Sequence, residues 1–371
     1  MDDMHSLTTF RLESSNLPGV FVESDVELTS SPDWFVPLAL LRAMADRRSL
    51  TIAEPISRTL ATSLDTIQDI YASWVPALRR VATSCSTTER QAAQGVSVFF
   101  SGGVDSFYSL LKHRGEIDNL ILIHGFDISL ADTNTFALAE AQARSAADLF
   151  GKRLIVVRTN LHWEQKPNLP CGWGMYHGAA LAAIVHALTT CHSKVYIASS
   201  FSYADLHPWG SHPLLDPLWS SEAVQIIHDG GETRVEKLRA MVQYPEMLSR
   251  LRVCWENSGE LNCGRCEKCL RTMLALRGLG AQSAAFPDTL TPQMVRIQEL
   301  TRDSVLFWRE LLGLNLPSDL AAAVRGTIRD WEVGLPPHAS TFRREVKRCL
   351  YASRQIIRNV KPVFRALLPT S

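Results

Sequence analysis

The sequence predicts an α/β fold, in which a doubly wound and mainly parallel sheet of five strands follows an N-terminal α+β extension. Two observations lead to this expectation. Five short apolar runs lie between residues 96 and 227, and stretches with helical apolar spacing separate them. Alternation of strand and helix at this spacing is typical of a parallel sheet covered by helices. In such a sheet, ligands bind at the carboxyl ends of the strands.

The five expected strands are short and rich in β-branched residues, as buried parallel strands are. They are Val96–Phe100, Leu120–His124, Leu154–Val157, Val195–Ala198 and a weaker run, Val224–Ile227. The helices expected between them are Val104–His113, the alanine-rich Phe136–Phe150, and His177–Leu188. These elements define an expected nucleotide-binding domain over residues 93–250.

Residues 1–92 carry no nucleotide motif and form the expected extension. Within it we expect strands at Val20–Val26 and Leu50–Ile52 and, from apolar spacing, helices at Phe35–Met44 and Ile67–Val81. Thr83–Gln94 is predicted to be a linker, because Ser, Thr, Gln and Ala cluster there.

Beyond the sheet domain, we expect a zinc-knuckle and helical region over residues 251–335 and a basic amphipathic helix over residues 336–371. Thr341–Leu368 holds eight Lys or Arg and one acid, Glu345. The favoured interpretation is a helix that packs on its own domain through its apolar stripe. The alternative is contact with an anionic membrane surface or with nucleic acid.

Composition narrows the class of protein. Of the 371 residues, 46% are apolar, and the 38 Lys plus Arg equal the 38 Asp plus Glu. A neutral chain shows no overall electrostatic attraction to nucleic acid. No run approaches the ~18 apolar residues of a membrane span, and the acidic N-terminus lacks the apolar core of a signal peptide. We therefore expect a cytoplasmic protein.

The sequence Ser101-Gly102-Gly103-Val104-Asp105-Ser106 directly follows the first expected strand and opens a helix. Its glycines permit a tight turn and close approach of a ligand. Backbone N–H groups at the helix start favour a pyrophosphate, and the Ser101 and Ser106 hydroxyls can donate to phosphate oxygens. Asp105 would repel phosphate unless it binds Mg²⁺ or orients the loop. The loop lacks the Lys-Ser/Thr pair of a Walker motif and the third glycine of a dinucleotide fingerprint.

Four of the eight cysteines crowd into sixteen residues with the spacing C-x8-C-x2-C-x2-C: Cys254, Cys263, Cys266 and Cys269. In a reducing compartment this spacing favours a metal over disulfides. Four thiolates complete a closed tetrahedral zinc site, so the metal would be structural and would join the helical part to the sheet domain. Reduced, unliganded cysteines and an iron–sulfur cluster are the alternatives.

The SGGxDS loop resembles that of the PP-loop (N-type) ATP pyrophosphatases, and its combination with the four cysteines is similar to the 7-cyano-7-deazaguanine synthases. The resemblance covers Val96–Arg271 and includes Cys269-Leu270-Arg271. It implies an adenine nucleotide alpha hydrolase-like fold that uses ATP, Mg²⁺ and Zn²⁺. It also implies that the loop contacts the phosphates and that adenosine lies near His124 and Asp127. Lys237 lies where the family places a lysine after its fifth strand.

The chain departs from this pattern in two places. About 95 residues precede the loop, whereas the deazaguanine enzymes begin almost directly with it. Their Gly-Tyr-Pro-Asp-Cys-Arg segment is replaced here by Ser202–Pro213. The resemblance therefore supports the type of enzyme more strongly than the substrate.

Several residues beyond the loop are candidates for function. Lys237 would neutralise charge that develops as pyrophosphate leaves, although it could instead be a solvated helix lysine. A Pro-rich loop after the fourth strand carries candidate substrate contacts: His207, Trp209, His212 and Asp216. Cys171, after the third strand, is a candidate sulfur carrier, although a lone loop cysteine is most often inert. His177 either caps its helix or faces the adenylate.

The resemblance, together with these residues, implies an AMP-forming ligase that adenylates a carboxylate or amide-type oxygen of a small molecule. Asp105 and Lys237 would assist, and ammonia or an amine would then displace AMP. No glutaminase segment is apparent, so free ammonia or a separate donor protein would supply the nitrogen. One alternative is a sulfur transferase served by a sulfur donor protein and dependent on Cys171. The other is a non-catalytic ATP-binding interaction protein.

Overall fold

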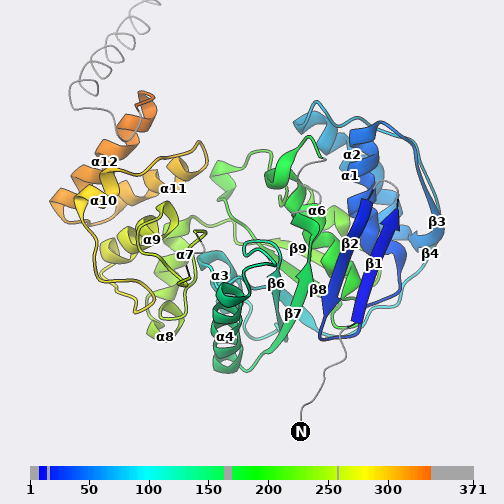
Figure 1. The fold of residues 1–371 in the computed structure, drawn as a ribbon, viewed down its shortest axis with the longest axis horizontal. Coiled ribbons are helices and arrows are strands. Elements are labelled where there is room, and N and C mark those ends of the chain that lie inside the picture. The colour runs from blue at the N-terminus through cyan, green and yellow to red at the C-terminus, as the bar shows by residue number, and fades with distance from the viewer. Residues whose placement is uncertain (1–7, 15–16, 163–168, 257–258, 336–371) are drawn as a thin grey trace, which may run out of the picture. The chain divides into compact units, whose positions relative to one another are not determined.

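The computed structural model of the chain describes residues 8–14, 17–162, 169–256 and 259–335 (Figure 1). Contacts divide the chain into two units, Met1–Leu261 and Asn262–Ser371, which are described in turn. The expected basic helix at Thr341–Leu368 lies outside the described residues.

The first unit contains a seven-stranded sheet with the strand order β1-β2-β7-β6-β5-β8-β9. Five of these strands are parallel and correspond to the five that were expected: β5 Val96–Phe99, β6 Asn119–His124, β7 Arg153–Thr159, β8 Lys194–Ala198 and β9 Gln225–Asp229. Three helices link them close to their expected bounds: α3 Val104–Lys112, α4 Thr133–Phe150 and α6 Gly172–Ala187. The predicted α/β class with a mainly parallel sheet is confirmed.

The sheet has two more strands than expected, and both come from the N-terminal segment. β1 Thr8–Ser14 and β2 Leu17–Ser24 form an antiparallel pair, and β2 continues the sheet by pairing antiparallel with β7. Figure 1 shows this pair at the edge of the sheet. The apolar pattern of Val20–Val26 predicted a strand there, but it could not show that the strand pairs with a segment 135 residues away.

The rest of the N-terminal segment forms α1 Val36–Asp46, β3 Leu50–Ser57, α2 Arg58–Trp74 and β4 Thr83–Thr88. Two predictions here were wrong in detail. The second helix begins at residue 58, where the Ser57 hydroxyl accepts a hydrogen bond from the N–H of Leu60, and it ends before the extended Val75. The expected linker contains β4, which pairs parallel with β3.

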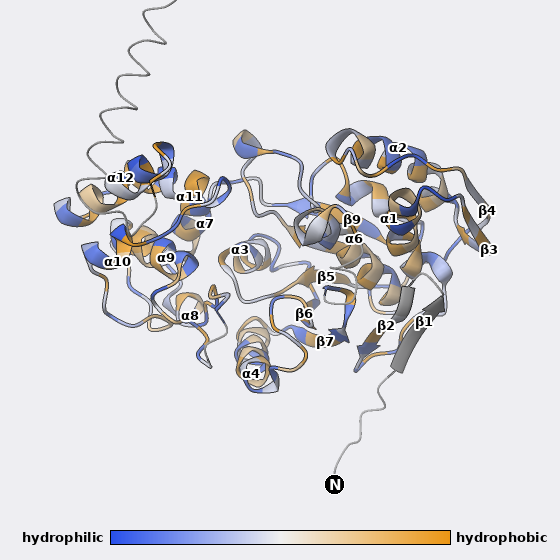
Figure 2. Ribbon diagram, turned by 45° about the horizontal axis from the view of Figure 1, so that its top comes forward, coloured by the Kyte–Doolittle hydropathy of each residue, from blue (hydrophilic) through white to orange (hydrophobic). Residues whose placement is uncertain are grey.

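Helices cover both faces of the sheet. Phe99 and Ile121 belong to one core with α1 and α6, whereas their neighbours Val98 and Leu120 are buried but outside that core. Adjacent residues of a strand point to opposite faces. The second face is covered by α3, which contacts β5 and β8, and by α4, which contacts β6 and β7. Hydrophobic residues dominate the central strands and α6 (Figure 2).

The order of the strands identifies where a ligand would bind. The chain passes from β5 to β6 and β7, and then crosses to β8 on the other side of β5. In sheets with such a reversal, ligands bind at the carboxyl ends of the two central strands. The loop Ser101–Ser106 follows β5 at this position, and residues 199–213 follow β8. α7 Arg234–Met241 and α8 Pro245–Leu248 come after β9.

The second unit is helical over its described residues. It contains α9 Glu267–Gly278, α10 Pro292–Arg296, α11 Ser304–Glu310 and α12 Ser318–Glu332. Its interior includes the buried Trp308, whose indole N–H donates a 2.6 Å hydrogen bond to the carboxylate of Glu267. Among all helices that the structure describes in both units, none has the length and apolar character needed to cross a membrane.

Candidate functional site

The glycine loop lies between β5 and α3, and a second segment packs directly against it. Gly102 has a φ of +75°, a conformation that favours glycine. A Cβ at Gly102 would lie 3.5 Å from Cβ of Arg252, and the N–H of Arg252 donates a 2.8 Å hydrogen bond to the carbonyl of Gly102. The backbone of residues 250–252 therefore fixes the shape of the loop.

The N-terminus of α3 has no side-chain cap. Gly103 is the N-cap residue, and no side chain bonds to the first turn. The first N–H groups of a helix have no partner within the helix, so they are suited to bind an anion. Ser101 is exposed and accepts a 3.3 Å hydrogen bond from the N–H of Gly103. Ser106 is buried and donates to the carbonyl of Gly103 at 3.1 Å.

Asp105 forms ion pairs with two cations from α7. Nζ of Lys237 lies 2.9 Å from one carboxylate oxygen, and the guanidinium of Arg234 lies 2.8 Å from the other. Lys237 is only 1% exposed and also donates a 2.6 Å hydrogen bond to the carbonyl of Ser199, after β8. Lys237 is therefore a buried group at the loop rather than a solvated helix lysine.

The start of α7 is well defined, which positions both cations. Thr233 caps the helix, and the side chain of Glu236 reaches back to the Thr233 N–H at 2.8 Å in a capping box. Arg234 was not among the predicted site residues. It could have been found from its spacing: Arg234 and Lys237 are three residues apart, and residues three apart lie on the same face of a helix.

The residues around the loop carry surplus positive charge. Arg234 and Lys237 contribute two positive charges, and Asp105 contributes one negative charge. Such an arrangement suits a polyphosphate, for which Arg and Lys are the usual protein partners. The side chain of Asp105 also provides an oxygen ligand of the kind that Mg²⁺ prefers.

The turn after β6 contains the two residues expected near adenosine. Gly125 has a φ of +112°, and any Cβ there would overlap the Thr159 carbonyl at the end of β7. The ring of His124 is buried and stacked 3.9 Å from Phe136, and its Nε2 donates to the Ser129 carbonyl at 3.0 Å. Burial lowers the pKa of His124. Asp127 is exposed at this edge of the sheet.

Two of the four residues predicted to contact substrate have buried side chains that hold the loop after β8. Asp216 is fully buried and accepts hydrogen bonds from the Ser211 hydroxyl at 2.7 Å and from the N–H of His212 at 3.2 Å. It also pairs with Nδ1 of His228, on β9, at 2.7 Å. Burial, followed by the charge of His228, lowers the pKa of His212.

The other two residues, His207 and Trp209, are half-buried members of a ring cluster at the carboxyl edge. The Trp209 ring centroid lies 5.3 Å from His177, 5.5 Å from Phe201 and 6.0 Å from His207. A Cβ at Gly174 would lie 3.0 Å from the Trp209 ring, so the indole packs on the first turn of α6. In the sequence, this contact is reflected by the glycine at position 174, which has no side chain and so leaves room for the indole.

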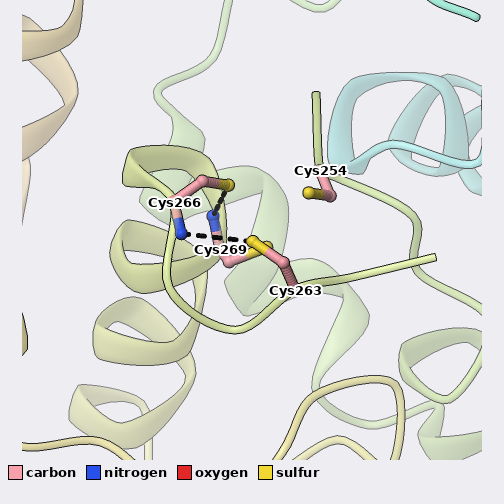
Figure 3. Close-up of side chains that lie close together, drawn as sticks. All are labelled: Cys254, Cys263, Cys266 and Cys269. Atoms are coloured by element: carbon pink, nitrogen blue, oxygen red, sulfur yellow. Dashed lines mark hydrogen bonds between the residues drawn. The ribbon is translucent and has the colours of Figure 1, made fainter. Parts of the chain in front are cut away.

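The four cysteines of the C-x8-C-x2-C-x2-C pattern come together. All four are buried, and their sulfur atoms lie within 4.8 Å of one another and face a common centre (Figure 3). Four sulfurs at ~2.3 Å from a tetrahedral zinc ion are about 3.8 Å apart, so the set fits zinc after a small contraction. The donor set is closed and leaves no position for substrate.

Backbone groups support the cysteines in this arrangement. The N–H of Cys266 points to Sγ of Cys263 at 3.3 Å, and the N–H of Cys269 points to Sγ of Cys266 at 3.5 Å. Hydrogen bonds to sulfur favour the thiolate, which is the form that binds metal. Gly264 has a φ of +66°, and a Cβ there would overlap Pro287. The knuckle therefore requires glycine at this position.

No protein family, curated protein or solved structure matches the chain in the three comparisons made.

Proposed function

We propose that the protein is an ATP-dependent, AMP-forming ligase with an adenine nucleotide alpha hydrolase-like sheet domain. It adenylates a carboxylate or amide-type oxygen of a small molecule, releases pyrophosphate and then AMP, and uses ammonia or an amine as the nucleophile. The Cys254, Cys263, Cys266 and Cys269 set holds a structural zinc ion. The single observation that carries the proposal is the Arg234–Asp105–Lys237 cluster beside a glycine loop at the reversal point of the sheet.

Each part of this cluster matches a step of the proposed reaction. The first N–H groups of α3 and the Ser101 hydroxyl bind the outer phosphates of ATP. Mg²⁺, when bound, would neutralise phosphate charge, and Asp105 would hold it. The acceptor oxygen attacks the α-phosphorus, and Lys237 with Arg234 stabilises the negative charge of the departing pyrophosphate.

The ion pairs of Asp105 support a catalytic role for Lys237 and Arg234. In the free protein, the two cations are paired with Asp105. If Asp105 held Mg²⁺, its charge would be shared with the metal, and Lys237 and Arg234 would be more available to the phosphates.

The sulfur-transferase alternative depends on Cys171, which is half-buried at the start of α6. Burial raises the pKa of its thiol, which disfavours the reactive thiolate. Cys171→Ser distinguishes the alternatives, since a ligase retains its turnover and a sulfur transferase loses it.

The proposed function is tested by incubating the protein with ATP, Mg²⁺, ammonium and fractionated cell metabolites. The products are assayed for AMP and pyrophosphate, and the consumed metabolite is identified by mass. AMP formation that requires a metabolite and is absent in Lys237→Met supports the ligase. Binding of ATP without AMP formation in any fraction supports an ATP-binding interaction protein instead.

A further inference from the structure

We propose that the four-cysteine metal site positions the glycine loop Ser101–Ser106. Zinc bound by Cys254 holds residues 250–252 against Gly102 and thereby raises the affinity of the loop for a nucleoside triphosphate. This inference rests on the proposed function and deepens it, because it makes the occupancy of the metal site a control on nucleotide binding.

Residues 250–252 pack against both glycines of the loop. The N–H of Arg252 donates a 2.8 Å hydrogen bond to the Gly102 carbonyl. A Cβ at Gly102 would lie 3.5 Å from Cβ of Arg252 and 3.9 Å from the Arg250 carbonyl oxygen, and a Cβ at Gly103 would lie 3.7 Å from the Arg252 carbonyl oxygen. The two backbones are therefore adjacent, and a shift of residues 250–252 changes the loop that opens α3.

The segment that makes this contact is held at its two ends. Residues 251–255, all of which the structure describes, belong to no helix or strand. At the first end, the guanidinium of Arg250 donates a 2.9 Å hydrogen bond to the Ser145 hydroxyl on α4. At the other end, Cys254 is 5% exposed. Cys254 follows Arg252 by two residues, so at most ~7 Å of chain separates the metal ligand from the contact with the loop.

Zinc would fix the second end of the segment. Sγ of Cys254 lies within 4.8 Å of the sulfurs of Cys263, Cys266 and Cys269, and all four face a common centre (Figure 3). Cys266 is the N-cap residue of α9, and its sulfur accepts from the N–H of Cys269, so a helix end holds two of the ligands. A zinc ion joins Cys254 to this helix end through bonds of about 2.3 Å. Without the ion, hydrogen bonds and packing alone hold Cys254.

The position of the loop determines how tightly it binds an anion, because the N–H groups at the start of α3 must point at the phosphates. A loop already held in its binding conformation loses less freedom when the nucleotide binds. Leu251 is fully buried and keeps the segment in place without zinc, so the coupling is moderate. We expect about a tenfold change in affinity, within the range usual for coupled sites. By linkage, a bound nucleotide tightens zinc binding by the same factor.

Hydrogen exchange of the wild-type protein tests the positioning of the loop without any nucleotide. Zinc is removed with a chelator under reducing conditions and is then restored. We expect exchange in residues 250–254 and 101–107 to become about tenfold faster without zinc and to return to its first rate with zinc. The buried helix α6 is the internal control and should change by less than about twofold.

Three outcomes of this experiment overturn the inference. The first is a wild-type protein that holds no zinc after purification under reducing conditions. The second is unchanged exchange of residues 101–107 when zinc is removed. The third is exchange that rises equally in the loop and in α6, because zinc then supports the whole fold and not the loop in particular.

Nucleotide affinity is measured by calorimetric titration with α,β-methylene-ATP in excess Mg²⁺. Cys254→Ser should bind about tenfold more weakly than the wild type, and added zinc should not restore its affinity. Cys85→Ser, a half-buried cysteine on β4, is the matched control and should bind as the wild type does. If Cys254→Ser does not fold, the zinc-free wild-type protein provides the same comparison. Equal affinities with and without zinc contradict the coupling.

The reciprocal measurement uses a competing chelator to determine the affinity for zinc with and without α,β-methylene-ATP. Tightening by the same factor supports the coupling, and unchanged zinc affinity in protein that binds the nucleotide refutes it. The proposed function can fail separately. If zinc-loaded wild-type protein does not bind α,β-methylene-ATP, the proposed function is rejected, and hydrogen exchange still decides whether zinc positions the loop.

Discussion

The ammonium group of Lys237 lies 2.9 Å from the carboxylate of Asp105, although the two residues are 132 positions apart in the chain. Lys237 comes from the helix after β9, and Asp105 comes from the first turn of the helix after β5. The same ammonium group binds the carbonyl of Ser199, beyond β8. One buried cation therefore links the ends of three parallel strands at the position where the sheet reverses.

Asp105→Asn should lower AMP formation at least 100-fold, because the amide removes the charge that pairs with Lys237 and that, in the proposed function, would bind Mg²⁺. The variant should also lose about 1–3 kcal/mol of unfolding free energy, since the buried Lys237 loses a charged partner. Asp148→Asn, at an exposed position of α4, is the control and should change neither quantity. Urea denaturation and an AMP assay measure both effects. A wild-type rate in Asp105→Asn would reject the assignment of the loop.

Gly102→Ala should weaken binding of α,β-methylene-ATP at least tenfold. Its φ of +75° costs a residue with a Cβ about 1–2 kcal/mol, so the alanine strains the loop even though its methyl group would make only an ordinary contact with Arg252. Gly115→Ala is the matched control, because a Cβ there meets nothing within 4 Å. Calorimetric titration compares the two variants, and equal affinities would contradict the proposed role of the loop.

The purified protein should contain about one zinc ion per chain under reducing conditions, as a closed four-thiolate site implies. Removing zinc with a chelator should lower the melting temperature, since binding to the native state is part of its stability. Cys266→Ser should lower the zinc content, and Cys85→Ser, a half-buried cysteine on β4, should not. Elemental analysis that finds iron and sulfide would identify a cluster, and finding no metal would reject the site.

Stability should fall as the pH is lowered from about 6.5 to 4, because His192 is buried and neutral. Its Nε2 donates to the Val185 carbonyl at 3.1 Å, and its Nδ1 accepts from the Ser97 hydroxyl at 3.0 Å. Burial lowers the pKa of His192 to about 4 in the folded state. In this window the unfolded chain binds a proton that the native state does not, at a cost of about 3 kcal/mol when complete.

His192→Gln tests the origin of this pH dependence. The variant should be less stable at pH 7, where the native hydrogen bonds are lost, but its melting temperature should change less between pH 7 and 5. His186 is also buried with a lowered pKa, so part of the dependence should remain. An unchanged slope in His192→Gln would show that His192 does not contribute.

Local patterns were sufficient to predict the central elements. The apolar runs of β5, β6, β7, β8 and β9 and the spacing of α3, α4 and α6 are properties of contiguous sequence. So is the cysteine spacing, which brought four sulfurs together as expected. Pairing between distant segments was not predictable, because apolar alternation defines a strand but not its neighbour. The addition of β2 to β7 and the pairing of β4 with β3 are examples.

In the candidate site, too, features of contiguous sequence were predictable, and contacts between distant segments were not. The SGGVDS loop was recognisable because its residues are consecutive, and Lys237 was singled out only by resemblance. The ion pair of Arg234 with Asp105 and the packing of residues 250–252 on Gly102 are tertiary contacts, which the sequence pattern does not show. Likewise, the burial of His212 and Asp216 follows from the Pro-rich loop folding back on β9, which residue types alone do not indicate.

The central claim is that this loop binds the outer phosphates of ATP so that the bond between the α and β phosphates breaks. The most direct test uses ATP labelled with ³²P at the α position in one reaction and at the γ position in another, with Mg²⁺, ammonium and the active metabolite fraction. The account predicts labelled AMP from the first and labelled pyrophosphate from the second. Labelled ADP and orthophosphate would contradict it.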